Sequence, residues 1–368
     1  MKKWNAAIIG MGFIGRHHFD ALLRLPHIRV AAICVHKKED IQRVREEFGV
    51  EKVTDDFREI MADPTIDVIH NCTPNHVHQA VNMAAIAAGK HIFAEKPLGL
   101  DAVEAYEVWQ AAKAAGIGNG VNYPCRMHAS LQEMRNRIRR GLGGRTLYVS
   151  GCFLQDSVAR HTDYTPRRIP ETSPARALLD IGVHWADTAM FVAGQPIKRV
   201  YAKMYTHYPV RIDPATGREI RVNSDDTTSV MVEFADGTPG SALFSKCMLG
   251  HKNDLQVVVS GEQCEYTWKQ EQCDRLFVGN RELGNETVFM SYEYSAPETL
   301  PYITMPPGHV MGWIEAQRNA FVGFYNSLED GSYVNPEQPY ATFREGWLGN
   351  RFVEACLQSQ REDRWIEL

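Results

Sequence analysis

Two short segments of the chain carry side chains whose types and spacing could do chemistry. The first is Ala94-Glu95-Lys96-Pro97, at the end of an expected buried strand. A lysine placed there could donate or accept a proton during a reaction. An isolated Glu–Lys pair is more often a surface ion pair of small energetic value, so this segment alone identifies no activity.

The second segment is Asp180-Ile181-Gly182-Val183-His184-Trp185-Ala186-Asp187. On an α-helix, Asp180, His184 and Asp187 would share one face. Such a face could hold a polyhydroxylated molecule by hydrogen bonds, and histidine changes protonation state near neutral pH. Two other interpretations stay open. In one, Asp180 caps a helix that buries His184. In the other, the three side chains bind a metal, but this is the less favoured interpretation because no fourth ligand lies nearby in the sequence, and we expect no metal site.

A glycine-rich turn lies near the N-terminus. Gly10-Met11-Gly12-Phe13-Ile14-Gly15 directly follows a β-prone run and opens a helical pattern, the context in which G-x-G-x-x-G predicts dinucleotide binding. Gly10 permits the tight turn, Gly12 lets the backbone approach a pyrophosphate, and Gly15 allows close helix–strand packing. The helix N-terminus offers free N–H groups to phosphate oxygens. Phe13 and Ile14, inside the turn, belong to the same predicted cofactor site.

The residues after the second expected strand bear on which dinucleotide binds. An NAD site usually has an acidic residue about 20 residues after the glycines. Here Val35 is followed by the cationic or titratable residues His36, Lys37 and Lys38. Cations at this place suit a 2′-phosphate, which predicts NADP, with NAD as the alternative. The other interpretation is that these residues only begin a solvated helix.

A third polar segment, Cys72-Thr73-Pro74-Asn75, directly follows another expected strand. The carboxyl ends of parallel strands face the ligand crevice near the point where strand order reverses. Thr73 and Asn75 suit contacts to ribose or nicotinamide, although Asn75 could instead only cap the next helix. From these segments, the predicted cofactor contacts are Cys72, Thr73, Pro74, Asn75, His78, Glu95 and Lys96.

The first third of the chain alternates between short apolar runs and helical patterns. This alternation predicts right-handed βαβ units and a doubly wound parallel sheet, that is, an NAD(P)-binding Rossmann domain over residues 1–124. The apolar runs lack polar alternation, as expected of strands covered on both faces. The expected strands are Asn5–Gly10, Ile28–Val35, Asp67–Cys72, His91–Glu95 and Ile117–Val121.

After about Asn122 the pattern changes to many strands and few helices. Turn signals such as Ala235-Asp236-Gly237 separate several of the strands. This order predicts a mostly antiparallel sheet in a second, α+β domain over residues 125–368. Two late helical patterns, Met311–Leu328 and Thr342–Gln360, are expected to pack back on the body of the protein.

Composition narrows the class of protein. A length of 368 residues predicts about two domains, and 44% hydrophobic with 23% charged residues excludes disorder of the whole chain. A net charge of −5 leaves no overall basic surface for nucleic acid. The eight cysteines form no C-x-x-C pair, which favours free thiols in the cytoplasm. No apolar run approaches the ~18 residues of a membrane span, so no membrane association is expected.

In combination, the motifs resemble the glucose–fructose oxidoreductase / inositol dehydrogenase / MocA family. The glycine turn, Glu95-Lys96-Pro97 and Asp180-x-Gly-x-His184-x-x-Asp187 occur in the family's order over the whole chain. The resemblance implies an NAD(P)-dependent dehydrogenase of sugars, cyclitols or related alcohols, with Lys96 as proton donor or acceptor and His184 as its partner. It implies that Asp180 and Asp187 orient the substrate. It also implies an open-faced sheet that forms a homodimer or homotetramer.

Two departures from the family pattern affect the expected substrate. Ala175-Arg176-Ala177 replaces a glycine-rich stretch, and the acidic residue after the second strand is absent. We therefore expect Arg176 to reach the substrate. Together with arginines of the preceding loop, it would suit an acidic or phosphorylated molecule. Tyr123 and Arg126 are further candidates for substrate contact.

The leading hypothesis is hydride transfer between nicotinamide C4 and a carbinol or carbonyl carbon of a sugar-like substrate, with Lys96 and His184 as acid–base groups and Asp180 beside them. The alternative is a non-catalytic dinucleotide-binding sensor or assembly protein on the same fold. A sensor has no chemical need for this set of residues.

Overall fold

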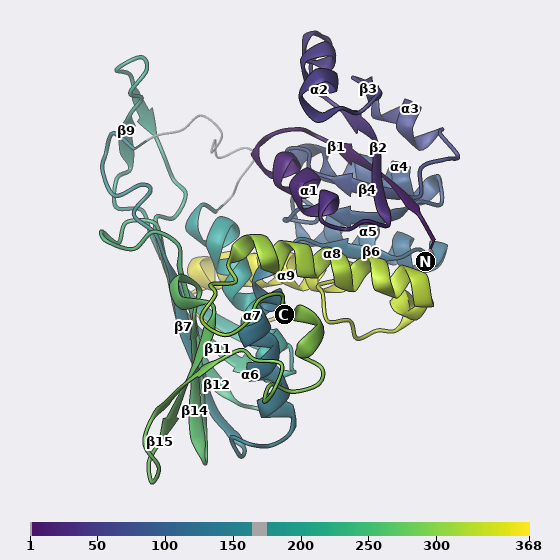
Figure 1. Ribbon diagram of the computed structural model, residues 1–368. Coiled ribbons are helices and arrows are strands. Elements are labelled where there is room, and N and C mark those ends of the chain that lie inside the picture. The colour runs from purple at the N-terminus through teal and green to yellow at the C-terminus, as the bar shows by residue number, and fades with distance from the viewer. Residues whose placement is uncertain (1, 164–174) are drawn as a thin grey trace. The chain divides into compact units, whose positions relative to one another are not determined.

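The computed structural model describes residues 2–163 and 175–368 and divides the chain into two compact units (Figure 1). The first unit comprises Met1–Met127 and Trp313–Asn350, and the second comprises His128–Gly312 and Arg351–Leu368. Arg167 and Arg168 of the arginine-containing loop lie outside the described residues.

A six-stranded parallel sheet forms the centre of the first unit, with the order β3-β2-β1-β4-β5-β6. Strand order reverses between β1 and β4, so a crevice for a ligand is expected beyond the carboxyl ends of these two strands. The predicted doubly wound parallel sheet is confirmed, except that the very short strand β3 was not predicted. The strands are β1 Trp4–Ile9, β2 Ile28–Cys34, β3 Lys52–Thr54, β4 Val68–Asn71, β5 His91–Ala94 and β6 Asn119–Val121.

The helices of the first unit begin and end where local signals place them. In α5, for example, the Asp101 side chain accepts a hydrogen bond from the Glu104 N–H at the start, and Gly116 adopts a φ of +63° just after the end. The distant helix α8 packs against α1. The helices are α1 Phe13–Leu23, α2 Ile41–Phe48, α3 Phe57–Met61, α4 His78–Ala87, α5 Ala102–Ala115 and α8 Trp313–Asp330.

The division of the chain differs from the expected boundary after residue 124. The first unit continues to Met127 and also takes in Trp313–Asn350. The physical reason is burial: the apolar side chains of α8, among them Phe321 and Phe324, lie against rings of the parallel sheet such as Phe93. The expected domain of residues 125–368 is therefore interrupted in the chain.

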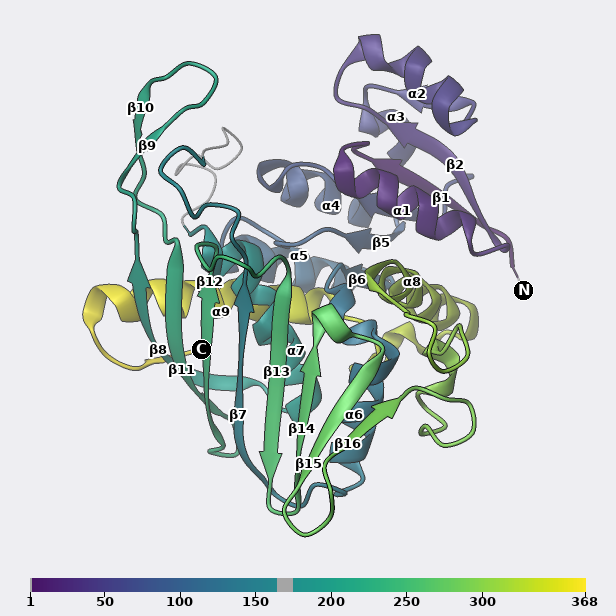
Figure 2. The ribbon, with the colours of Figure 1, turned by 60° about the vertical axis from the view of Figure 1, so that its left-hand side comes forward.

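A nine-stranded sheet dominates the second unit (Figure 2). Its order is β16-β15-β14-β13-β7-β12-β11-β8-β17, and among the described residues only β7 and β12 pair in parallel. The predicted mostly antiparallel sheet is confirmed. The strands are β7 Thr146–Leu154, β8 Ile197–Tyr205, β11 Thr227–Phe234, β12 Pro239–Ser245, β13 Asp254–Gly261, β14 Cys264–Lys269, β15 Arg275–Asn280, β16 Glu286–Phe289 and β17 Ile366–Glu367, with a separate hairpin of β9 Val210–Ile212 and β10 Glu219–Arg221.

Helices α6, Ala129–Arg139, and α7, Val183–Ala193, pack on this sheet (Figure 2). Gly151 of β7 makes the close approach possible, because a Cβ there would lie 2.5 Å from the Trp185 indole nitrogen of α7. Helix α9, Phe343–Glu362, begins in the first unit and ends in the second. Side chains at alternate positions of β11, such as Met231 at 46% exposure, point away from the core. The role of this face in oligomerisation stays a prediction.

Candidate active site

The glycine turn between β1 and α1 has the geometry of a phosphate cradle. Gly10 has a φ of +96°, which only glycine adopts without strain. A Cβ on Gly15 would lie 2.0 Å from the Gly10 carbonyl oxygen, so Gly15 is needed for packing. At Gly12, by contrast, no described atom lies within 4 Å of the Cβ position. Since no packing requires this glycine, the open space beside the N-terminus of α1 fits a bound pyrophosphate.

The segment after β4 is organised by Asn71, which the sequence analysis missed. Its Oδ1 accepts a hydrogen bond from Thr73 Oγ1 at 2.6 Å, and its Nδ2 donates to Asn82 Oδ1 at 2.8 Å. Cys72 is buried, and its carbonyl lies 2.5 Å from the position of a Cβ on Gly10. Asn71 and Cys72 therefore hold this segment next to the glycine turn, with Thr73 half-buried at the rim.

Asn75 does not cap the following helix. It begins the 3-10 turn Asn75–Val77, with the exposed Pro74 at its N-cap position, and α4 starts behind Val77. No side-chain hydrogen bond caps either element in the described chain. The capping alternative is thus wrong, because the intervening turn moves the helix start beyond the reach of Asn75.

His78 ties two of the predicted cofactor segments together. Its Nε2 lies 2.7 Å from the carbonyl oxygen of Thr73, and its Nδ1 lies 2.6 Å from that of Pro97. Burial lowers the pKa of His78, while the two carbonyl contacts act in the opposite direction. With 1% of its surface exposed, His78 fixes the two segments from behind rather than facing solvent.

Glu95 and Lys96 follow β5 at the same edge of the sheet. Glu95 is 7% exposed, and one of its oxygens, Oε2, accepts a hydrogen bond from the Lys96 backbone N–H at 3.3 Å. Lys96 is half-buried. The segments that end β1, β4 and β5 therefore place the glycine turn, Thr73 and Lys96 on one edge of one sheet.

The cations after β2 lie where the sequence analysis expected them. His36 and Lys37 are exposed, and Lys37 Nζ lies 3.8 Å from a carboxylate oxygen of Glu39. The carboxylates of Asp55 and Asp56, which follow β3, are close as well. Burial, and after it the charges of Asp56 and Asp55, raises the pKa of Cys34 at the end of β2 to about 12. Both signs of charge therefore surround the end of β2.

In the second unit, the segment from Asp180 to Asp187 is not one regular α-helix. Residues Leu178–Gly182 form a π-helical turn, and α7 starts only at Val183. The π turn adds a residue to the helical turn, so the simple i, i+4 geometry assumed from the sequence does not apply. Asp187 is buried at 1% exposure, whereas the Asp180 side chain is 43% exposed and His184 is half-buried.

Asp180 has a partner that the sequence analysis did not identify. The ammonium group of Lys246, just after β12, contacts the Asp180 carboxylate, and Lys246 is 1% exposed. A buried ammonium stabilises the ionised form of a neighbouring carboxylate. The only sequence signal was a lysine directly after an apolar strand.

Arg176, which was expected to reach the substrate, is buried within the second unit. It is 4% exposed, and its guanidinium donates to Asp226 at 3.0 Å. The same carboxylate accepts a hydrogen bond from the fully buried Arg211 at 2.8 Å. Arg176 thus contributes to an internal ion-pair cluster of its own unit, and the expected reach into the substrate site is not supported.

Tyr123 and Arg126, the further candidates for substrate contact, are also buried, at 2% and 4% exposure. Tyr123 lies against α9, where a Cβ on Gly349 would come within 2.4 Å of the tyrosine hydroxyl. Arg126 belongs to the 3-10 turn Pro124–Met127. Their contact with substrate stays a prediction.

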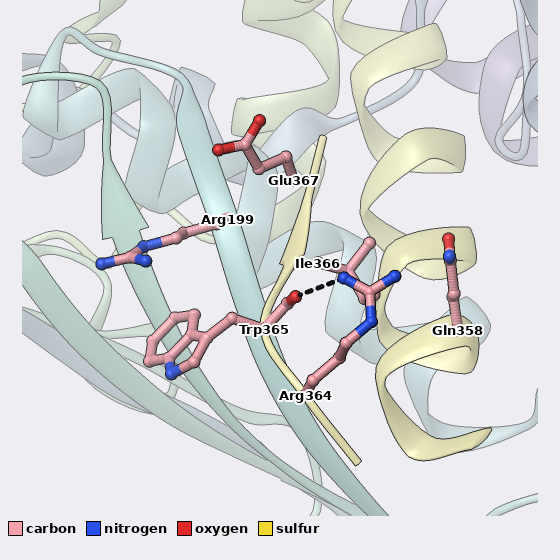
Figure 3. A pocket seen from close by; sticks show the side chains of 6 residues that line it. All are labelled: Arg199, Gln358, Arg364, Trp365, Ile366 and Glu367. Carbon is pink, nitrogen blue, oxygen red and sulfur yellow. Dashed lines mark hydrogen bonds between the residues drawn. The ribbon is translucent and has the colours of Figure 1, made fainter. Parts of the chain in front are cut away.

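A surface recess of about 450 Å³ lies elsewhere, along the β8–β17 edge (Figure 3). Its arginines are engaged locally: Arg199 pairs with Glu233, and Arg364 donates to the Trp365 carbonyl. It contains none of the predicted site residues. Within the described residues, no group of three His, Cys, Asp or Glu side chains could hold a metal, and no helix is long and apolar enough to cross a membrane.

Comparison with known proteins supports the family. The protein-family model described as "Oxidoreductase family, NAD-binding Rossmann fold" matches residues 4–123, and the family model "GFO/IDH/MocA C-terminal domain" matches residues 131–267. The chain belongs to the Gfo/Idh/MocA oxidoreductase family. The predicted resemblance is thereby confirmed, and with it the class of enzyme, a dehydrogenase acting on CH–OH groups with an NAD-binding Rossmann domain.

Individual relatives match all or most of the chain. Levoglucosan dehydrogenase of Pseudarthrobacter phenanthrenivorans is 27% identical over 100% of this chain and 99% of its own length. A structure of levoglucosan dehydrogenase in complex with NADH and L-sorbose superposes with a TM-score of 0.91 at 27% identity, covering 100% of this chain and 99% of the other. The scyllo-inositol 2-dehydrogenase (NAD(+)) of Bacillus subtilis is 27% identical over 70% of this chain and 72% of its own length.

Proposed function

We propose that this protein oxidises a secondary hydroxyl of a sugar, anhydrosugar or cyclitol, and reduces the corresponding ketone, with Lys96 as the acid–base group. The observation that carries the proposal is the arrangement within the first unit. The open Gly12 cradle and the half-buried Lys96 follow β1 and β5 at one edge of a single sheet. Two relatives are named levoglucosan dehydrogenase and myo-inositol 2-dehydrogenase, which supports a sugar, anhydrosugar or cyclitol as the substrate.

The turn from Gly10 to Gly15 would hold the pyrophosphate of the dinucleotide, and Thr73 would contact its nicotinamide half. When bound, the nicotinamide accepts or returns the hydride. In the oxidation direction Lys96 takes the proton of the substrate hydroxyl while the C–H bond of the same carbon breaks. In reduction Lys96 returns that proton to the carbonyl oxygen.

The second unit supplies the residues for orientation. Asp180 contacts the ammonium group of Lys246 and keeps 43% of its side chain exposed, which suits a carboxylate that accepts hydrogen bonds from substrate hydroxyls. His184, half-buried at the start of α7, is the proposed partner of Lys96 in proton transfer. Asp187, buried in the next turn of α7, orients this end of the helix.

A panel of substrates tests the activity. Turnover is measured with levoglucosan, inositols, aldoses and sugar acids, using NAD and NADP separately. Lys96→Ala and His184→Ala should each lower kcat by ~10²–10⁴-fold, while Lys113→Ala, at an exposed lysine of α5, should leave kcat unchanged. Near-normal turnover of Lys96→Ala would refute its acid–base role. Tight dinucleotide binding without turnover of any substrate would favour the sensor alternative.

We further propose a preference for NADP over NAD, on account of His36 and Lys37 at the end of β2. The exposed carboxylates nearby, such as Glu39, oppose this preference, so the expected discrimination is modest, about tenfold in Kd. Lys37→Ala should weaken NADPH binding and leave NADH binding unchanged. Equal or tighter binding of NADH by the unaltered protein would overturn the preference.

A further inference from the structure

Four buried side chains of the first unit form a continuous line of polar contacts that ends next to Lys96. Glu95 Oε1 lies 3.0 Å from His18 Nε2, and His18 Nδ1 lies 3.0 Å from His70 Nδ1. His70 Nε2 in turn lies 2.9 Å from the Tyr325 hydroxyl. Glu95 is 7% exposed and the other three are 0% exposed. We call these four residues the histidine chain.

The histidine chain runs through an aromatic interior. The His70 ring stacks on Phe93 and on Tyr325, with centroids 5.8 and 6.0 Å apart. Burial, reinforced by the charge of His18, lowers the pKa of His70 well below its usual value. Burial, with a smaller contribution from Asp67, raises the pKa of Tyr325 well above its usual value. At neutral pH the imidazole of His70 and the phenol of Tyr325 are therefore both uncharged.

The hydrogen bonds join the four side chains end to end. A carboxylate only accepts, so His18 Nε2 must donate to Glu95. Between His18 Nδ1 and His70 Nδ1 one nitrogen donates and the other accepts, so the two rings orient each other. His70 Nε2 and the Tyr325 hydroxyl form the last hydrogen bond. Each member therefore orients the next.

The state of Glu95 depends on these donors. Burial by itself raises the pKa of Glu95, but hydrogen bonds from His18 and Asn122 and the nearby charges of His18 and Lys96 outweigh it and hold the pKa below its usual value. The Glu95 carboxylate in turn affects its surroundings. Burial is the main cause that raises the pKa of Cys72, and the charge of Glu95 raises it further. His78, whose pKa burial lowers, also experiences the charges of Glu95 and Lys96.

We propose that the histidine chain is a positioning device for Lys96: it holds the Glu95 carboxylate in one orientation, and that carboxylate fixes the Lys96 backbone through its N–H. This inference rests on the proposed role of Lys96 and extends it to residues of α1, β4 and α8.

The first test measures the ionisation of Glu95 without any turnover. Carboxyl groups are followed by isotope-edited infrared spectroscopy, and the Glu95 signal is assigned by its loss in Glu95→Gln. Glu95 should be ionised at pH 7 in the unaltered protein and protonated in His18→Leu, which removes the hydrogen bond and the charge of His18, the two largest effects that oppose burial. His18→Gln, which restores an N–H donor, should return the carboxylate signal. A Glu95 that stays ionised in a folded His18→Leu variant would overturn the proposal.

The second test separates positioning from a merely structural role. A displaced acid–base group slows the chemical step but leaves the substrate contacts in place, so kcat and KM for alcohol oxidation are compared. Glu95→Gln should lower kcat about tenfold with KM unchanged, and Tyr325→Phe, which removes only a remote hydroxyl, should lower kcat less. His91→Gln is the matched control at the opposite end of β5, where the His91 ring accepts from the Gly118 N–H.

The outcomes of the two tests are distinct. An unchanged kcat in a folded Glu95→Gln variant, or a lower kcat with an equally altered KM, would show that Glu95 supports the fold alone and would overturn the positioning role. Full turnover of Lys96→Ala would instead refute the proposed function of Lys96. In that case the infrared result still decides whether His18 holds Glu95 as an anion. Circular dichroism and Tm confirm that each variant is folded.

Discussion

Gly12 and Gly15 share one turn, but the structure predicts opposite consequences for replacing them with alanine. Gly12 has φ −73° and ψ −163°, an extended conformation that any L residue adopts, and no described atom lies within 4 Å of its Cβ position. Gly15 would place a Cβ 2.0 Å from the Gly10 carbonyl oxygen. Gly12 is therefore free to change as far as the fold is concerned, and Gly15 is not.

The magnitudes follow from these distances. Gly12→Ala should leave the free energy of unfolding within about 1 kcal/mol of the unaltered protein, because it adds no clash and slightly restricts the unfolded chain. The added methyl group occupies the approach of the pyrophosphate, so the Kd for the dinucleotide should rise about 100-fold, or about 2.7 kcal/mol. Gly15→Ala forces α1 away from β1 and should cost about 1–3 kcal/mol of stability.

Urea unfolding measures the first quantity, and titration calorimetry with NADPH and NADH measures the second. The two variants serve as controls for each other, since each adds one methyl group to the same turn. Unaltered dinucleotide affinity in Gly12→Ala would refute the placement of the pyrophosphate. A large loss of stability in Gly12→Ala would show that packing, not a ligand, requires glycine at this position.

Three further predictions concern buried ionisable side chains and their partners. Burial lowers the pKa of His128 to about 4. Below about pH 6.5 the unfolded chain therefore binds a proton at this histidine that the folded chain does not bind, so the free energy of unfolding should fall by about 2 kcal/mol between pH 7 and 5. His128→Leu should reduce that fall. Asp180→Asn removes the carboxylate that the buried ammonium of Lys246 contacts, and should destabilise the protein by about 1–3 kcal/mol. A Lys246→Met/Asp180→Asn double variant that is no more stable in urea than Asp180→Asn would contradict this explanation. Asp226→Asn, which faces two buried arginines, should cost about 3–5 kcal/mol in urea unfolding. Glu262→Gln, at an exposed ion pair, is the control and should leave the free energy of unfolding nearly unchanged.

The parts of the site that the sequence predicted are those formed by neighbours in the chain. The glycine turn, its strand and its helix all lie within residues 4–23, so apolar runs and glycine spacing suffice to place them. The same holds for Lys96, which immediately follows an apolar strand. Hydrophobic periodicity also predicted both sheets, because the side chains that a strand buries are decided largely by its own residue pattern.

Three site features could not be predicted because they depend on contacts between distant residues. Lys246 reaches Asp180 across 66 positions of the chain, and Tyr325 reaches His70 across 255. Arg176 looked like a loop arginine, and only the packing of β11 shows that it is buried against Asp226. The π turn before α7 likewise has no signature in residue types alone.

The sequence by itself determined the family, the two sheets, the phosphate turn and the identity of the candidate acid–base residues, since each depends on local pattern and on the order of motifs. Only the tertiary structure decided how charge is distributed around them. It joined Trp313–Asn350 to the first unit, and this brought the Tyr325 hydroxyl to the buried histidines behind Glu95. The physical reason is that the protonation state of a buried group depends on its solvation and on nearby charges in space, which a one-dimensional pattern does not contain.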